Sequence, residues 1–293
     1  MDGMINLYKP SNMTSHDVVK IVRRKFKKTK VGHTGTLDPM AIGVLPLCLG
    51  KATRITEYLT NNDKSYRCEM TLGIETDTQD IWGTILKEYV GEIVIYEQDV
   101  LNVFKTFLGE IEQIPPMYSA VRVQGKRLYQ YARSGKEIEV KPRKIKIYDL
   151  YNIQIYQNKI TFDVKCSKGT YIRTLCYDIG KKLGYGAALS YLERTSSGIF
   201  TKENAISVED LDTLSPETYM IHMDAPLENM GAVDIKDEKG FRKVSNGCKL
   251  MEKEYTWKTQ HNELTRIYYG KSFVAIGIYN TIDHSISMKK VFL

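Results

Sequence analysis

The segment Gly32-His33-Thr34-Gly35-Thr36-Leu37-Asp38-Pro39 contains the residues best suited to chemistry. Its two glycines let the backbone approach a ligand closely, and Asp38 closes the loop with a carboxylate. A simpler interpretation fits the same residues. Asp38 can cap a turn or a helix, with Pro39 at the first helical position. On the segment alone, both interpretations stay open.

Other chemical motifs fail on their spacing. Gly43 to Thr53 ends in Gly50-Lys51, as a phosphate-binding loop does, but six residues instead of four separate the glycines. The segment from Glu75 to Asp80 is similar to a calcium loop, yet Asp80 stands where glycine is needed and Leu86 where glutamate is needed. The five cysteines and five histidines form no C-x-x-C pair and no Cys/His cluster, so no metal site is expected.

The sequence around the Asp38 loop distinguishes between these two interpretations of Asp38. The stretch GHTGTLDPMAIGVLPLCLGKATR resembles the signature of the TruB family of tRNA pseudouridine synthases. Further matches lie in the right order along the chain: Lys9-Pro10 with Thr14–Val19, Lys64–Tyr66, Gly73–Thr78, Ile114–Ala120 and Ser167–Leu175. The resemblance covers roughly residues 1–205. Because several colinear motifs are far harder to obtain by chance than one, we interpret Asp38 as a catalytic residue.

The resemblance implies a catalytic set of Asp38, Tyr66 and Arg173. Asp38 is the nucleophile by the family pattern; attack on C1′, addition to C6 of the ring and a glycal-like route all stay open. Tyr66 falls where the family stacks an aromatic ring on the target uracil, and a role as a base on the sugar also stays open. Arg173 falls where an arginine pairs with the nucleophile, because a cation within ~4–6 Å keeps a carboxylate ionised. A core-facing strand tyrosine and an exposed helix arginine are the plainer alternatives.

Five further residues are implied to bind the substrate or to support the site. Tyr171 and Leu192 match positions that line the pocket, where simple packing is the rival interpretation. His33 is similar to the histidine that helps to hold the flipped-out nucleotide. Lys9 and Pro10 resemble a pair that braces the active-site loop.

Two positions depart from the family pattern. Asn12 stands where the family usually has glycine, and asparagine tolerates a left-handed backbone. Glu193 stands where an arginine is common, which weakens the expectation of an RNA contact there.

The implied reaction requires few chemical groups besides these side chains. Pseudouridine formation breaks the N1–C1′ bond, turns the uracil and rejoins it through C5, so that no electron or group is gained. The resemblance therefore implies no cofactor and no metal. An ionised carboxylate, a shield against water and a platform for the extracted base are needed. Extracting a base costs on the order of a few kcal/mol, which a stacking ring can offset.

Net charge favours an anionic partner. The 293 residues carry a formal charge of +7, and seven basic residues lie between Lys20 and Lys30, Lys28 among them. A solvated helix face would explain this run, but the second run of Lys141, Arg143, Lys144 and Lys146 favours a polyanion. No apolar stretch approaches the length of a membrane span and no secretion signal is visible, so a cytoplasmic location is expected.

Hydrophobic patterns predict a mixed architecture. Strands are expected where apolar residues alternate, at 66–72 and 160–166, and a β-like run covers 273–279. Helices are expected from Thr14-Ser15 onward, through Val100–Leu108 with Gly109 as the C-cap, and through Ile172–Leu183. Because strands and helices are mixed rather than strictly alternating, the fold class is α+β. The resemblance implies a mostly antiparallel pseudouridine-synthase-like sheet with flanking helices.

Two domains are expected. Residues 1–228 form the catalytic domain, with an insertion at about 124–150 whose Tyr-, Lys- and Arg-rich part, Gln124 to Arg143, resembles an arm that clamps RNA. Residues 229–293 form a small β-rich PUA-like RNA-binding domain, because Val244–Cys248 resembles the Asn-Gly turn of such domains.

The resemblance implies a cytoplasmic, monomeric enzyme that converts uridine 55 in the T loop of tRNA to pseudouridine by base flipping. It would bind the T stem-loop and the acceptor stem without a guide RNA or a membrane. A non-catalytic RNA-binding or tRNA-folding module and a guide-RNA-dependent synthase are the alternatives. Intact Asp38, Tyr66 and Arg173 argue against the first, and the long insertion without basic tails argues against the second.

Overall fold

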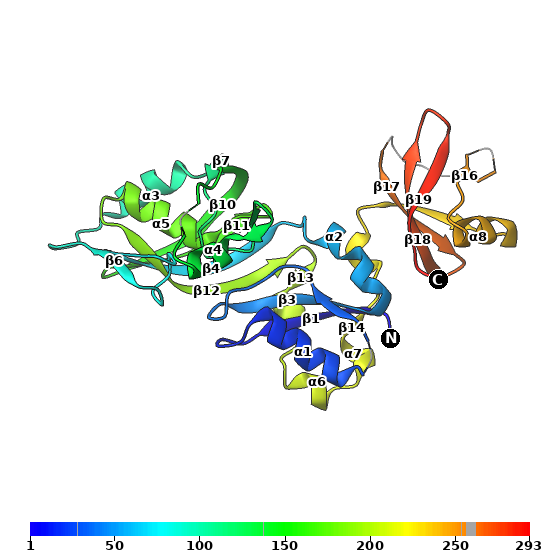
Figure 1. Cartoon of the computed structure of the whole chain (residues 1–293), viewed down its shortest axis with the longest axis horizontal. Coiled ribbons are helices and arrows are strands. Elements are labelled where there is room, and N and C mark those ends of the chain that lie inside the picture. The colour runs from blue at the N-terminus through cyan, green and yellow to red at the C-terminus, as the bar shows by residue number, and fades with distance from the viewer. Residues whose placement is uncertain (28, 137, 253, 256–261) are drawn as a thin grey trace.

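The computed structural model describes residues 1–27, 29–136, 138–252, 254–255 and 262–293. Lys28 in the first basic run, residue 137 in the expected insertion, and residues 253 and 256–261 in the expected C-terminal domain lie outside the described residues. The chain forms two lobes, a larger one with both sheet and helices and a smaller C-terminal one (Figure 1). None of the helices among the described residues is long and apolar enough to span a membrane.

A ten-stranded sheet forms the larger lobe, with the strand order β14-β1-β3-β12-β4-β11-β10-β7, β2 beside β3, and β13 beside β12. Its strands are β1 (Gly3–Lys9), β2 (Val31–His33), β3 (Ile42–Leu49), β4 (Lys64–Leu72), β7 (Gly109–Gln113), β10 (Arg143–Tyr156), β11 (Lys159–Cys166), β12 (Ala187–Ser197), β13 (Phe200–Thr201) and β14 (Met220–Ile221). Among these described strands, neighbours run antiparallel except β3 and β12. The predicted mostly antiparallel α+β fold is confirmed.

The alternating sequences produce the central strands as predicted. Every second residue of β4, from Lys64 to Leu72, is buried, and β11 buries Ile160, Phe162, Val164 and Cys166. Helices α3 (Glu97–Lys105) and α5 (Ile172–Lys182) cover this part of the sheet (Figure 1). The predicted end of α3 at Gly109 is wrong. The helix stops at Lys105 because Phe107 turns into the core, and Gly109 begins β7 with a φ of +90°.

Helix α1 (Ser15–Lys25) begins where its cap predicts. The Thr14 side chain accepts a hydrogen bond from the backbone N–H of Asp17, and the Asp17 carboxylate accepts one from the backbone N–H of Thr14. Val18 and Val22 pack on β1 and β3, while Arg23 and Arg24 stay exposed. Asn12, just before the helix, has a φ of 60°, the left-handed conformation expected there.

Short hairpins and helices connect the main strands. They are η1 (Gly50–Ile55), α2 (Thr56–Leu59), β5 (Ile74–Thr76), β6 (Ile85–Glu88), β8 (Arg122–Val123), β9 (Lys126–Arg127), α4 (Leu128–Arg133), η2 (Lys202–Asn204), α6 (Asp210–Thr213), α7 (Pro216–Tyr219) and η3 (Ala225–Leu227). Residues 143–150, which the expected insertion included, belong to β10 of the main sheet. Ile145 and Ile147 are buried there, and Arg143 pairs with Gln113 of β7.

The smaller lobe is a five-stranded sheet in the order β15-β17-β18-β19-β16. Its elements are β15 (Gly231–Ile235), α8 (Glu238–Ser245), β16 (Leu250–Met251), β17 (Leu264–Tyr269), β18 (Ser272–Asn280) and β19 (Ser285–Val291). Its residues Phe273 and Phe292 share an apolar cluster with Met4 and Val44 of the larger lobe. The two lobes therefore pack through a common hydrophobic core.

Candidate active site

The Asp38 loop, residues 34–41, joins β2 to β3 and is held by the start of α1. The Ser15 hydroxyl donates to the carbonyl of Leu37 at 3.1 Å and accepts from its N–H at 2.8 Å. The N–H of Thr34 donates to the carbonyl of Pro46 at 3.1 Å, and that of Ala41 to the carbonyl of Asp38 at 3.1 Å. These contacts fix the backbone on both sides of the carboxylate.

Lys9 braces the same loop from behind. Its ammonium is fully buried at the end of β1 and donates to the carbonyls of Pro10 (2.8 Å), Met13 (2.7 Å) and Pro39 (3.1 Å). Burial lowers the pKa of Lys9 to about 8, although the nearby Asp38 carboxylate opposes this shift. The Lys9-Pro10 pair thus lies directly behind the loop that carries Asp38.

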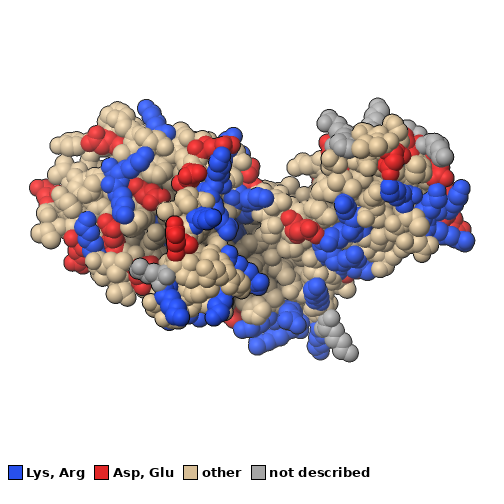
Figure 2. Space-filling view, turned by 45° about the horizontal axis from the view of Figure 1, so that its top comes forward, with Lys and Arg blue, Asp and Glu red and all other residues tan. Residues whose placement is uncertain are grey.

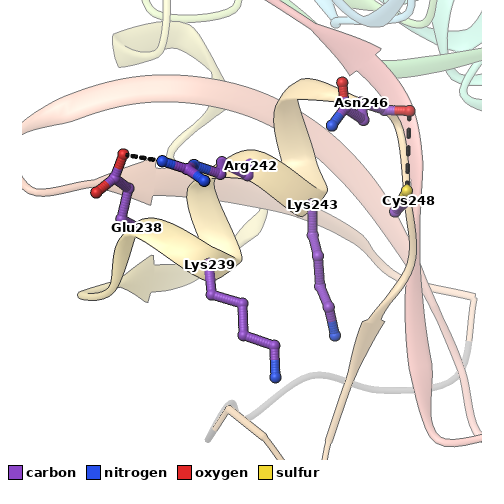
Figure 3. Close-up of a pocket in the computed structure, with 6 residues that line it drawn as sticks. All are labelled: Glu238, Lys239, Arg242, Lys243, Asn246 and Cys248. Atoms are coloured by element: carbon purple, nitrogen blue, oxygen red, sulfur yellow. Dashed lines mark hydrogen bonds and ion pairs between the residues drawn. The ribbon is translucent and has the colours of Figure 1, made fainter.

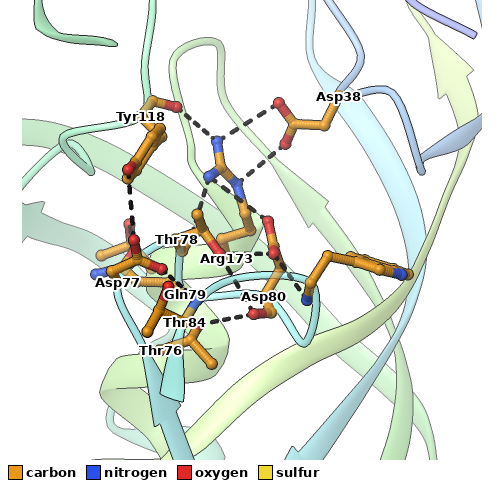
Figure 4. Close-up of polar contacts among 11 residues, drawn as sticks. Asp38, Thr76, Asp77, Thr78, Gln79, Asp80, Thr84, Tyr118 and Arg173 are labelled. Atoms are coloured by element: carbon orange, nitrogen blue, oxygen red, sulfur yellow. Dashed lines mark hydrogen bonds and ion pairs between the residues drawn. The ribbon is translucent and has the colours of Figure 1, made fainter. Parts of the chain in front are cut away.

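Arg173, in the first turn of α5, pairs with Asp38 (Figure 4). Its Nε lies 3.0 Å from Asp38 Oδ2, while Nη1 donates to the carbonyl of Thr78 and Nη2 to that of Tyr118, both at 2.9 Å. The arginine side chain is 7% exposed and the aspartate side chain 45%. Because two carbonyls hold the guanidinium independently of Asp38, the cation keeps its place while the carboxylate stays accessible.

Asp80 is a second acidic neighbour of Arg173, and sequence reasoning missed it. Its Oδ2 lies 3.8 Å from Arg173 Nη1, and its Oδ1 accepts from the Thr78 hydroxyl (2.6 Å) and the Trp82 N–H (3.2 Å). Burial raises the pKa of Asp80, against the opposing pull of Thr78 and Arg173. Residues 75–80 entered the sequence reasoning as a failed calcium loop and as part of a family match that ended at Thr78, so nothing pointed to Asp80.

Tyr66 and Leu192 lie on adjacent strands of the sheet. They are 8% and 9% exposed and belong to the same buried cluster as Leu37 and Ala41 of the Asp38 loop. Burial raises the pKa of Tyr66 to about 12, so its hydroxyl is protonated at neutral pH. Both residues therefore belong to the apolar core that also holds Leu37 and Ala41 of the loop.

Tyr171 is the residue before α5, and Gln113 holds its backbone on both sides. Gln113 Oε1 accepts from the Tyr171 N–H at 2.8 Å, and its Nε2 donates to the Tyr171 carbonyl at 3.0 Å. Burial raises the pKa of Tyr171. This arrangement connects the end of β7 to the turn of α5 that carries Arg173.

His33 ends β2, at the entrance to the Asp38 loop. Its Nδ1 atom is buried and has no hydrogen-bond partner among the described residues. Burial and the nearby Arg194 and His16 lower its pKa, so that the ring is neutral at pH 7.

Glu193, the unusual residue at an arginine position, is buried and fully engaged. Its carboxylate accepts from the hydroxyls of Tyr8 (2.6 Å) and Tyr191 (3.2 Å), and it pairs with Lys202 at 2.6 Å. These donors keep the pKa of Glu193 low despite burial. The residue therefore offers no free charge to an RNA.

Basic side chains gather in several groups on the surface, including the outer end of the C-terminal lobe (Figure 2). On that lobe, α8 lines a shallow hollow with Lys239, Arg242 and Lys243 (Figure 3). Asn246 and Gly247 end the helix, with Gly247 at a φ of +70°.

Known proteins share this sequence and fold. Residues 23–172 match the model of the TruB family pseudouridylate synthase (N terminal domain), and residues 173–230 match that of the tRNA pseudouridylate synthase B C-terminal domain. The chain belongs to the TruB family. The boundary between the two matches falls at the start of α5, and the second matched segment supplies strands β12, β13 and β14 of the ten-stranded sheet.

Relatives of the TruB chain match it over nearly its full length. A tRNA pseudouridine synthase B from Alkaliphilus oremlandii is 45% identical over 99% of this chain and 97% of its own, and one from Clostridium tetani is 46% identical over 94% and 95%. Among solved structures, a Cbf5-Nop10-Gar1 complex contains a chain that is 30% identical, with a TM-score of 0.77 over 99% of this chain and 85% of its own. A chain of an H/ACA RNP bound to a substrate RNA has 28% identity and a TM-score of 0.75 over the same shares.

Proposed function

We propose that this TruB protein converts uridine 55 in the T loop of tRNA to pseudouridine, with Asp38 as the nucleophile. One observation carries the proposal. The Asp38 carboxylate is paired with an arginine that two backbone carbonyls hold in place, in a chain whose full-length relatives are tRNA pseudouridine synthases.

The site residues divide the reaction between them. Asp38 acts at the junction of sugar and base, where the N1–C1′ bond breaks and the C5–C1′ bond forms; C5 loses a proton and N1 gains one, so the atoms balance. Arg173 places a fixed cation 3.0 Å from Asp38 Oδ2 and so holds the carboxylate in position. No redox step or group transfer occurs, so the reaction itself requires no cofactor.

The pocket around Asp38 holds the extracted base. Tyr66 stacks on the uracil, and Leu192 and Tyr171 pack around it. His33 occupies the space that the flipped nucleotide leaves. A neutral imidazole with a buried, unpaired Nδ1 gains a hydrogen bond there when RNA arrives.

We assign the rest of the tRNA contact to the periphery of the molecule. The chain divides into a catalytic domain, residues 1–228, and a PUA-like domain, residues 229–293. The lysines of α8 in the PUA-like domain contact phosphates of the acceptor stem. The arm that begins at Gln124 and carries α4 contacts the T stem-loop. The protein acts as a cytoplasmic monomer without a guide RNA.

Unmodified tRNA, incubated with the purified protein alone, tests this function. Pseudouridine mapped to position 55 supports it, and an isolated T stem-loop should also react, more slowly. Activity only after a guide RNA is added would favour the guide-dependent alternative. Tight binding with no pseudouridine would favour a tRNA-folding module.

A further inference from the structure

Arg194 is a buried cation in the middle of the main sheet. It lies on β12, is 2% exposed, and pairs across the sheet with Tyr66 of β4 and with Gly43 of β3. Gly43, at a φ of +108°, allows this approach, because a Cβ there would lie 2.3 Å from the carbonyl oxygen of Arg194. The guanidinium thus lies between the strand of the stacking tyrosine and the strand that follows the Asp38 loop.

The contacts of Arg194 are to neutral groups. Its Nε donates to the carbonyl of Val44 at 2.7 Å, and its Nη2 donates to that of Gly35 at 3.1 Å. Tyr66 is its partner across the antiparallel strand pair, so the two side chains are neighbours on one face of the sheet. Within the described part of the chain, no carboxylate lies within ion-pair distance of it. Burial accordingly lowers its pKa.

A buried arginine without an acidic partner is costly, because it gives up its hydration without gaining an ion pair. Two carbonyl contacts alone do not require a charge, since a neutral donor would satisfy them. The neighbours of Arg194 point to a role at the site: its cross-strand partner Tyr66 belongs to the proposed active site, and Gly35 lies three residues before Asp38. Charged groups whose pKa values are strongly shifted are concentrated at functional sites.

We propose that Arg194 is a positioning residue for Tyr66. Its guanidinium donates to the phenol oxygen, which holds the ring against the base and leaves the phenol proton free to face the substrate. Through Gly35 the same side chain fixes the distance between the ring and the Asp38 loop. The inference rests on the proposed function, because Tyr66 is assigned to the uracil there.

A double-mutant cycle tests the coupling directly. We expect Arg194→Met to lower the single-turnover rate of pseudouridine formation by about 50-fold, while the Kd for tRNA changes less than threefold. In a Tyr66→Phe background, the same substitution should lower the rate less than threefold, because the oxygen that Arg194 orients is gone.

Glu193→Gln is the matched control, a neighbouring buried charge on β12 bound to Tyr8 instead. It should leave the rate nearly unchanged in both backgrounds. If Arg194→Met does not fold, as judged by circular dichroism, Arg194→Lys replaces it and should show a deficit that disappears with Tyr66→Phe. Equal deficits in both backgrounds, a loss of affinity alone, or no deficit overturns the proposal. An inactive wild-type protein would instead count against the proposed function.

Discussion

Asp38→Asn separates catalysis from folding and binding. Asparagine has the shape of aspartate but carries no charge, and Arg173 keeps its two carbonyl partners and its contact with Asp80. Because the Asp38 side chain is 45% exposed, its ion pair is worth at most about 1 kcal/mol of folding stability. For a chain of this size we expect Tm to fall by no more than about 4 °C.

Turnover should respond very differently from stability. Removing the nucleophile is expected to slow pseudouridine formation by at least ~10⁴-fold, or about 5 kcal/mol of the barrier. Affinity for tRNA should stay within about tenfold, because phosphate contacts elsewhere supply most of it.

Release of tritium from tRNA that carries [5-³H]uridine measures the turnover, since C5 loses its hydrogen when the new bond forms. Filter binding and thermal unfolding measure the other two quantities on the same preparation. A variant that turns over at close to the wild-type rate would refute the nucleophile assignment. A variant that unfolds would show that the carboxylate serves the fold instead.

Three further predictions follow from the structure. Arg173→Met leaves the partly buried Asp80 carboxylate without its cation, and we expect a loss of about 3 kcal/mol and a Tm lower by roughly 6–12 °C; an unchanged melting curve would contradict this. Burial lowers the pKa of Lys64 to about 8, so between about pH 8 and 10.5 the unfolded chain binds a proton that the folded chain has released, and stability rises with pH across this window. Lys64→Met should remove that rise, at most about 3 kcal/mol, in urea titrations along a pH series, whereas identical pH profiles would argue against it. Lys239→Ala should reduce the slope of log affinity for tRNA against log salt by about 0.7–0.9, and an unchanged slope would remove α8 from the RNA interface.

Local sequence determined those helices and strands whose start or pattern depends on residues only a few positions apart. The capping box of Thr14 starts α1 where predicted, and alternation at period two places Tyr66 on the buried face of β4. These features follow from backbone hydrogen bonding and side-chain spacing, which act over one turn or one strand. The end of α3 was wrong for the same reason: only the tertiary core decides that Phe107 turns inward.

The site residues were not predicted from local sequence patterns. Asp38, Tyr66 and Arg173 were named through resemblance to a family, because nothing in their spacing indicates that residues 38 and 173 meet. Asp80 carried no such signal beyond the matched stretch. Its place beside Arg173 depends on how the turn after β5 packs against α5, a contact between segments that are ninety-three residues apart.

The sequence by itself determined the strands, the helix starts and the family pattern that points to one carboxylate. The tertiary structure alone decided which further charges lie near it. Asp80 and Arg194 come from separate parts of the chain and lose water when the sheet closes. Desolvation and partner geometry set the energies of these charges, and both arise only when distant segments are packed together.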